Sequence, residues 1–184
     1  GKEIELTITS QTTFSASPPL LSIAQGLLKG KKMDLLVQKA NELGVTSFLP
    51  FHSDHCVAPS PKDAKLLRWD KILLESCKQC GRPIPLQVAE LLAFDSVLAQ
   101  GDKYEMKIIF WERENQNRLQ DFHAVPAAGS ILALIGPEGG FSTEEIGRAT
   151  QAGFTPVSLG RLTLRAETAT LAAMSVLRYL GGNL

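Results

Sequence analysis

The sequence predicts an α/β protein built on a parallel sheet, and three observations support this prediction. Short apolar runs alternate with amphipathic segments along the 184 residues, as in a sheet flanked by helices. One such run, 131–135, is almost wholly apolar and stands between two glycines, which is typical of a strand buried on both faces. With 44% hydrophobic and 21% charged residues, the chain can form one good core.

The composition also indicates a compartment. No apolar run approaches the ~20 residues needed to cross a membrane, and no signal peptide is visible. Three cysteines, an odd number, suit a reducing environment better than a disulfide framework. We therefore expect a cytoplasmic protein.

The N-terminal stretch predicts a strand that has no obvious partner. Ile4, Leu6 and Ile8 alternate with polar residues, as in a half-buried strand. Residues 10–19, SQTTFSASPP, are typical of a linker.

The main domain is expected to begin with a strand at 20–28 and a lysine-rich turn. A helix follows, with Asp34 in its first turn, an apolar face that includes Leu36 and Val37, and Gly44 at its end. The remaining pattern predicts a strand at 45–51, a helix at 62–80 closed by Gly81, a strand at 86–89, a short helix around 95–99, a strand at 107–111 and a polar loop at 113–129 with room for a short helix.

A first glycine-marked turn follows the apolar run 131–135. Gly136, Gly139 and Gly140 allow positive φ and a close approach of a ligand to the backbone, while Pro137 stiffens the turn. Ser142, with glutamate three residues later, predicts a capping box at the start of a helix over 143–152, which Gly153 ends.

A second turn, 160–166, follows a predicted strand at 155–159 and leads into a final helix over 167–180. Arg165 and Glu167 stand beside Thr168 at the start of this helix, where backbone N–H groups are free. A purely structural interpretation is open here, with Glu167 favouring the helix dipole and Arg165 in a surface ion pair. Together the two turns predict a ligand site.

A phosphate-binding loop is the obvious alternative for a glycine-rich turn between a strand and a helix. The sequence GPEGG matches neither GxGxxG nor GxxxxGK[ST]. Pro137 removes an N–H donor and Glu138 adds negative charge, both unfavourable for an anion. A ligand with adenosine, amino-acid and cationic parts suits the turn better, although the residues alone do not identify it.

A zinc site is a second alternative, because two histidines and three cysteines could supply four ligands. These residues are His52, His55, Cys56, Cys77 and Cys80. The last two fall inside an amphipathic helix, where a cysteine behaves as a small apolar residue. We therefore predict no metal.

The net charge is zero, with 19 basic and 19 acidic residues, so the chain lacks the overall basic character of many nucleic-acid binders. Basic residues do cluster locally, although such clusters are often only solvated faces. The clusters are Lys29, Lys31 and Lys32; Arg68, Lys71, Lys78 and Arg82; and Arg161 and Arg165.

Four ordered phrases resemble one family. IGPEGGFSTEEI (135–146), followed by LGRLTLRAETA (159–169), is similar to the paired signatures of the RsmE family of the SPOUT superfamily. KGKKMDLLVQKANELGV (29–45) and RWDKILLESCKQCGR (68–82) resemble two further segments of that family. The resemblance covers nearly everything from about residue 20 onward.

The resemblance implies an enzyme that methylates N3 of a uridine in 16S ribosomal RNA with S-adenosylmethionine. It implies a SPOUT-type parallel sheet flanked by helices with a C-terminal trefoil knot, a rare exception to the usual topology rules. It also implies a homodimer with no membrane contact, whose partner is 16S rRNA or the small ribosomal subunit. Residues 1–16 would be the remnant of an N-terminal PUA-like RNA-binding barrel and its linker, and 17–184 the methyltransferase domain.

With this family as the hypothesis, we assign catalysis to Arg165 and Glu167. Arg165 would stabilise the charge that grows on the base, and Glu167 would orient it or handle the proton. The expected cofactor contacts are Leu134, Ile135, Gly136, Pro137, Glu138, Gly139, Gly140, Leu159, Gly160, Leu164, Arg165 and Thr168. The expected RNA contacts are Lys29, Lys31, Lys32, Arg82 and Arg161, with Arg82 near the RNA or cofactor cleft. Glu112 has two interpretations, a carboxylate that faces the cofactor or an ordinary surface carboxylate.

Two departures from the family pattern stand out. Leu162 and Thr163 fill positions where the family usually has Arg-Ile, and Asn41 replaces a threonine. Two other functions stay open at this point, a non-catalytic RNA-binding or assembly module of the same fold and a ribose 2′-O-methyltransferase. Cofactor binding separates the first from an enzyme, and nucleoside mass spectrometry of the product separates the second.

Overall fold

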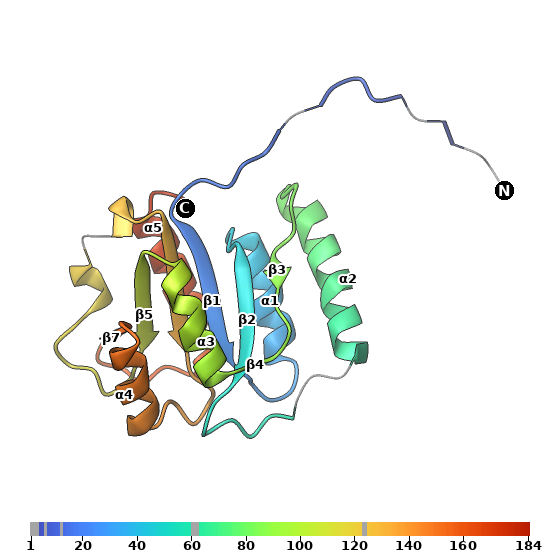
Figure 1. Ribbon diagram of the computed structural model, residues 1–184. Coiled ribbons are helices and arrows are strands. Elements are labelled where there is room, and N and C mark those ends of the chain that lie inside the picture. Colours follow the sequence, from blue (N-terminus) through green and yellow to red (C-terminus); the bar gives the residue numbers. More distant parts are fainter. Residues whose placement is uncertain (1–3, 6, 12, 60–62, 123–124) are drawn as a thin grey trace.

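A parallel β-sheet lies between two layers of helices (Figure 1). The computed structural model describes residues 4–5, 7–11, 13–59, 63–122 and 125–184, without the side chains of 63–66 and 126. The strands are β1 (Leu20–Gly26), β2 (Ser47–His52), β3 (Gln87–Val88), β4 (Leu92–Ala93), β5 (Met106–Phe110), β6 (Ser130–Ile135) and β7 (Thr155–Val157). The α-helices are α1 (Lys32–Glu42), α2 (Asp63–Cys80), α3 (Phe94–Gln100), α4 (Thr143–Gln151) and α5 (Ala166–Leu180), and the short 3-10 helices are η1 (Gly101–Lys103), η2 (Leu119–Asp121) and η3 (Val125–Ala127).

The strand order is β3-β2-β1-β6-β5-β7. Strand β4 pairs with the carboxyl end of β2, whereas β3 pairs with its amino end. Every pair in this sheet is parallel. The central strands β1 and β6 are almost completely buried, as strands covered on both faces must be. The predicted parallel α/β fold is therefore confirmed.

The register brings the carboxyl ends of four neighbouring strands level with one another. Gln25 of β1 lies opposite Ile135 of β6, and Ile135 lies opposite Phe110 of β5. Phe110 in turn lies opposite Val157 of β7. Both glycine turns leave the sheet from this row, at the edge where open α/β sheets usually bind ligands.

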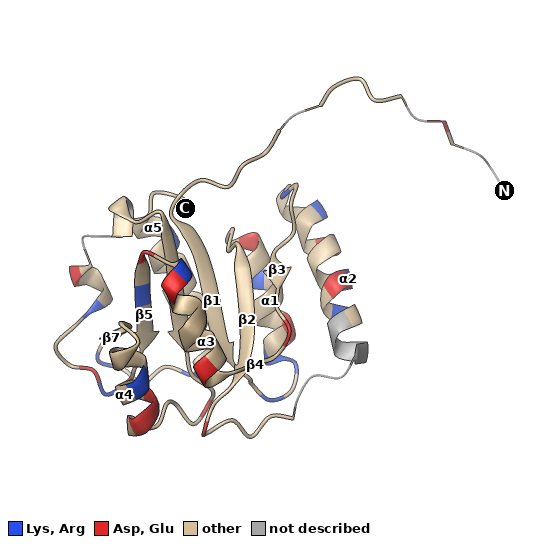
Figure 2. Cartoon of the chain, in the orientation of Figure 1, with Lys and Arg blue, Asp and Glu red and all other residues tan. Residues whose placement is uncertain are grey.

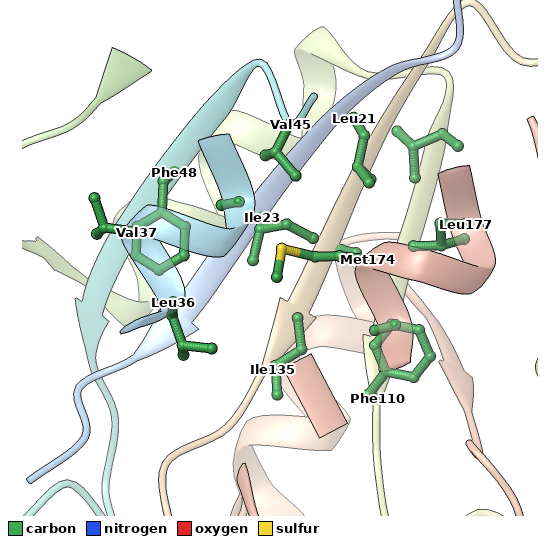
Figure 3. Close-up of a cluster of buried hydrophobic side chains, with 14 of the residues drawn as sticks. Leu21, Ile23, Leu36, Val37, Val45, Phe48, Phe110, Ile135, Met174 and Leu177 are labelled. Atoms are coloured by element: carbon green, nitrogen blue, oxygen red, sulfur yellow. The ribbon is translucent and has the colours of Figure 1, made fainter. Parts of the chain in front are cut away.

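Two apolar cores hold the sheet in place. One lies under α1, α2 and α5, and Figure 3 shows Met174 of α5 beside Ile23 of β1, with Leu177 further along the same helix. The other lies under α3 and α4, around Phe51 and Phe141. Complete burial of one large apolar side chain contributes about 1.5–3 kcal/mol, so these clusters fix the strands whose ends form the site.

The N-terminal residues form no strand in the part of the chain that the structure describes. Ile4 and Ile8 are 82% and 88% exposed, and the segment runs away from the sheet as an extended arm (Figure 1). The alternating pattern predicted a strand here, but backbone N–H and C=O groups need a partner strand to form a ladder. Leu6, which belonged to that pattern, lies outside the described residues.

The other differences concern the ends of elements. Strand β7 stops at Val157, two residues before the predicted end of the strand 155–159. The Ser158 hydroxyl donates to the Gly160 carbonyl and accepts from the Gly160 N–H, which turns the chain. The two-residue strand β4 was not predicted, since two residues show no periodicity. Lys62, the predicted start of the second helix, lies outside the described residues.

None of the helices in the described ranges is long and apolar enough to span a membrane.

Candidate functional site

A cleft of about 490 Å³ opens at the carboxyl ends of β5, β6 and β7. Both glycine turns form its walls. The lining residues are Lys32, Phe110 to Glu112, Ile135 to Phe141, and Ser158 to Ala166 with Ala169. This volume is typical of a small-molecule site, and the walls combine apolar side chains with exposed backbone.

The first turn is held by close backbone packing. A Cβ added to Gly26, the last residue of β1, would lie 2.6 Å from the backbone nitrogen of Pro137, so only glycine lets the two segments approach. Gly140 has φ 70° and its N–H donates to the Pro137 carbonyl at 3.0 Å. The predicted capping box is confirmed: Ser142 Oγ accepts from the Glu145 N–H, and the Glu145 carboxylate accepts from the Ser142 N–H.

A buried amide fixes the start of this turn from below. Gln25 Nε2 donates to the carbonyls of Gly26, Ile135 and Gly136 at 2.9, 3.4 and 3.1 Å. Its Oε1 accepts from the Thr170 hydroxyl of α5 at 2.5 Å. One side chain thus joins the end of β1, the first turn and the helix that follows the second turn.

The loop after β2 supports the first turn from outside. The Asp54 N–H donates to the buried carboxylate of Glu145 at 3.0 Å, and Ser142 Oγ donates to the Asp54 carboxylate at 2.7 Å. A ring nitrogen of His55 lies 3.0 Å from the Gly139 carbonyl oxygen. These contacts leave the turn little freedom, as a preorganised ligand site requires.

The second turn carries the exposed cations of the cleft. Arg161 and Leu162 project outward, and Leu162 is 80% exposed. Arg165 is the N-cap residue of α5; its carbonyl accepts from the Ala169 N–H at 2.8 Å, while its guanidinium is exposed at the cleft. A cation in this position can reach a molecule bound in the cleft.

Lys32 ties the two turns together. Its ammonium lies 3.0 Å from the Glu138 carboxylate in the first turn and 3.1 Å from the Glu167 carboxylate at the start of α5. These hydrogen bonds, first to Glu138 and then to Glu167, raise the pKa of Lys32. Burial alone would raise the pKa of Glu138, but donors from Lys32 and the Lys29 N–H outweigh it, so the pKa is lowered. The backbone N–H of Glu167 and then Lys32 lower the pKa of the Glu167 carboxyl against the effect of burial.

Most of the predicted cofactor residues meet in the cleft. The structure places Ile135, the turn 136–140, Leu159, Gly160, Leu164 and Arg165 in its lining, together with Lys32 and Arg161 from the predicted RNA set. Leu134 is not there, because alternation along β6 directs it into the core under α3 and α4. Thr168 is exposed on α5 outside the lining, and Glu167 touches the cleft only through Lys32.

Several lining residues were not predicted, above all those that follow β5. Trp111 donates its backbone N–H to Val157 at 3.0 Å, and its ring Nε1 is buried with no acceptor among the described residues. Glu112, which the sequence left open, does line the cleft, beside Gly140. Their position directly after a buried strand, level with the first turn, was the available signal.

Arg82 lies elsewhere, which corrects its expected place at the cofactor cleft. Its guanidinium donates to the carbonyls of Asn41, Val45 and Ile84 at 2.7–2.8 Å, near the amino end of β2 and thus at the opposite edge of the sheet. Burial lowers the pKa of Arg82. It lines a separate groove beside α2 rather than the cleft.

Asn41, the residue that departs from the family pattern, belongs to the same structural cluster. Its amide donates to Ser76 Oγ at 3.0 Å and accepts from the Leu86 N–H at 2.8 Å. It therefore joins α1 to α2 and to the segment before β3. A structural role, not ligand binding, explains a buried amide at this position.

Lys29 and Lys31 are exposed in the loop between β1 and α1. Figure 2 shows basic and acidic residues interspersed over the elements, with blue segments in the loop that leads into α1.

In the described ranges no three His, Cys, Asp or Glu side chains lie close enough together to hold a metal ion. Cys77 instead contacts the Asn41 amide, whose nitrogen lies 3.3 Å from its sulfur.

The cleft fits a ligand of the kind that the sequence indicated. Carboxylates at Glu112 and Glu138 suit a cation, and apolar walls such as Leu159 and Leu164 suit an adenine ring. S-adenosylmethionine, which joins adenosine, an amino acid and a sulfonium cation, matches this set of groups.

Comparison with known proteins supports the same interpretation of the cleft. A family described as an RNA methyltransferase domain matches residues 15–178. The ribosomal RNA small subunit methyltransferase E of Bacillus subtilis is 33% identical over 170 residues, 88% of this chain and 66% of that protein. The chain spans about two thirds of the length of the curated relatives that it matches.

Two solved structures extend the likeness to the fold. One is a ribosomal RNA small subunit methyltransferase E from Neisseria gonorrhoeae bound to S-adenosylmethionine, with a TM-score of 0.80 and 34% identity over 92% of this chain and 70% of that one. The other is a methyltransferase from Legionella pneumophila in complex with the same cofactor, with a TM-score of 0.81 and 33% identity over 88% of this chain and 66% of that one.

Proposed function

Because the chain belongs to the RNA methyltransferase domain family, which it matches over residues 15–178, we propose that it uses S-adenosylmethionine to methylate N3 of a uridine in 16S ribosomal RNA. The solved relatives that bind this cofactor support the proposal, as does the curated relative that acts on the small-subunit RNA. We also propose that it acts in the cytoplasm, on 16S rRNA or the small ribosomal subunit.

The cleft formed by the two glycine turns is the observation that carries this proposal. Its walls come from both family signatures, 135–146 and 159–169, and its charges and volume suit the cofactor. The turn 136–140 and Gly160 would hold the ligand largely through backbone groups. Leu159 and Leu164 would pack against its adenine ring.

When bound, S-adenosylmethionine supplies an electrophilic methyl group on a positively charged sulfur. The protein must then present uracil N3 in line with that methyl, let the N3 proton leave, and stabilise the negative charge that grows on the base. Arg165 is exposed at the cleft and is the proposed source of that stabilisation.

Glu167 suits the orienting role better than proton transfer. A carboxyl with a lowered pKa is ionised at neutral pH and is a weak base, because efficient bases have pKa values near the working pH. Its negative charge, two residues from Arg165, can instead hold the guanidinium. The proton would then leave to water.

A calorimetric titration of this chain with S-adenosylmethionine tests the proposal first, and one site per chain is expected. Methyl transfer to 16S rRNA, followed by nucleoside mass spectrometry, then identifies the modified atom. A 2′-O-methylated ribose would replace the N3 assignment. Cofactor binding without any transfer would favour a non-catalytic RNA-binding module.

The finer features of the family are part of the same proposal. We propose a trefoil knot in the C-terminal segment and a homodimer, with residues 1–16 belonging to an N-terminal PUA-like barrel and its linker and 17–184 forming the catalytic domain. The exposed arm at 4–5 and 7–11 supports the division. Lys29, Lys31 and Arg161 remain the proposed RNA contacts. Sedimentation equilibrium tests the dimer, and a monomer at micromolar concentration would contradict it.

A further inference from the structure

We propose that Lys32 is a positioning residue that clasps the two turns of the cleft together, and that its charge sets how the cleft distinguishes S-adenosylmethionine from the demethylated product. The second half of this statement rests on the proposed function. The sequence predicted an RNA contact for this lysine, and the proposed clasp would replace that role.

The geometry of the ammonium carries the proposal. Lys32 is the first residue of α1, yet its Nζ lies 3.0 Å from a carboxylate in the first turn and 3.1 Å from one at the start of α5. All three side chains are partly buried, with 31%, 33% and 18% of Lys32, Glu138 and Glu167 exposed. The Lys32 ammonium thus donates a hydrogen bond to Glu138 and forms an ion pair with Glu167.

The clasp adds an outer connection to an inner one. Inside the protein, Gln25 bonds the carbonyl groups at the start of the first turn and receives a bond from Thr170 of α5. At the surface, Lys32 joins the same two segments through Glu138 and Glu167, and the Lys29 N–H holds the Glu138 carboxylate as well. The turns are thus tied at two levels.

The charges of the clasp do not cancel. Two carboxylates face one ammonium, which leaves the clasp itself with one net negative charge beside the cleft, while Arg161 and Arg165 add positive charge elsewhere in the lining. S-adenosylmethionine carries a sulfonium cation, whereas S-adenosylhomocysteine has a neutral sulfur. Removal of the lysine charge should weaken binding of the neutral product, because the two turns are no longer joined. Binding of the cationic cofactor should weaken less, because the additional negative charge attracts its sulfonium.

The binding experiment compares both ligands by calorimetry in the parent chain, Lys32→Met, Lys32→Arg and a control. We expect Lys32→Met to raise the ratio of the product Kd to the cofactor Kd by about three- to fivefold, the size of a partly exposed charge interaction. Lys32→Arg should restore the parent ratio. Lys71→Met, at an exposed α2 position outside the cleft lining, makes the same change of net charge and should leave the ratio unchanged.

A measurement without ligand tests the clasp independently of the cofactor. Amide hydrogen exchange at 136–140 and 167–170 should quicken at least several-fold in Lys32→Met but not in Lys71→Met. A double-mutant cycle between Lys32→Met and Glu138→Gln, read by chemical unfolding, should show coupling between the two side chains.

Parent-like exchange together with an unchanged ligand ratio would overturn the clasp. A loss confined to RNA binding would return Lys32 to a phosphate contact and would also overturn it. If the parent chain binds no S-adenosylmethionine, the proposed function fails, while the exchange experiment still decides whether the clasp exists.

Discussion

Gln25 and Thr170 lie 145 positions apart in the chain and share a buried hydrogen bond of 2.5 Å from the threonine hydroxyl to the glutamine carbonyl oxygen. Both side chains are completely buried. The bond connects the final helix to the strand that supports the first turn. It turns two separate sequence signatures into the walls of one cleft.

Replacement of Thr170 by valine keeps the shape of the side chain and leaves the Gln25 oxygen buried without its donor. We expect a loss of about 1–3 kcal/mol in the free energy of unfolding, measured with urea. Thr168→Val, on the exposed side of the same helix, should cost far less. Equal losses at the two positions would show that the buried bond contributes nothing.

Arg165→Ala should reduce methyl transfer to 16S rRNA by about 10²–10³-fold, the effect of removing one donor from a developing negative charge. The affinity for S-adenosylmethionine should change by less than about threefold, because the turns hold the cofactor through backbone groups. Single-turnover kinetics separates the two effects. Arg148→Ala on α4, outside the cleft lining, is the control. Parent-level transfer by Arg165→Ala with normal cofactor binding would remove the assignment.

Local signals explain what the sequence predicted well. The capping box at Ser142 needs only residues three apart, and it is present as expected. The glycine turns also depend on local backbone conformation, and Gly140 has the positive φ that its residue type allows. The apolar run 131–135 needed only its own composition to indicate a strand buried on both faces.

Contacts between distant segments could not be predicted. The Lys32 and Glu138 pair spans 106 positions, so nothing near this lysine in the sequence indicated that two carboxylates pair with it. The place of Arg82 away from the cleft could not be predicted for the same reason, since its acceptors are backbone carbonyls that only the folded chain brings together. The N-terminal alternation forms no strand among the described residues, because a strand depends on a partner that periodicity does not reveal.

Arg82→Ala should lower the free energy of unfolding by about 2–3 kcal/mol, because three backbone carbonyls lose a charged donor. Arg82→Lys should recover only part of this, since an ammonium lacks the planar fork that reaches several acceptors. Cofactor affinity should stay within about twofold at a temperature where both variants are folded. Weak cofactor binding by a fully stable Arg82→Ala would restore the sequence-based role.

Gly26→Ala places a methyl group 2.6 Å from the backbone nitrogen of Pro137, which cannot move aside as a flexible side chain can. We expect a loss of about 1–3 kcal/mol in stability together with weaker cofactor binding, because the first turn must shift. Gly147→Ala is the matched control, at a helical position on α4 where the added Cβ meets no atom within 4 Å beyond its chain neighbours and the helix's own backbone. It should stabilise the protein by about 0.5–1 kcal/mol. Thermal unfolding of the two variants would contradict this reasoning if their shifts had the same sign.

The Lys32 clasp should stabilise the fold only within a definite range of pH. The pKa of Lys32 is raised above its ordinary value of 10.5, so its contribution is complete below that value and is lost as the pH rises through the raised pKa. The pKa values of Glu138 and Glu167 are lowered below 4.5, so their contribution is present above 4.5 and is lost as the pH falls through the lowered values. The difference in unfolding free energy between the parent chain and Lys32→Met should therefore be constant from about pH 5 to 10 and shrink outside this range. Urea unfolding at closely spaced pH values measures it, with Lys71→Met as the reference for net charge, and a difference that persists unchanged at pH values well below 4.5 would exclude the carboxylates as its source.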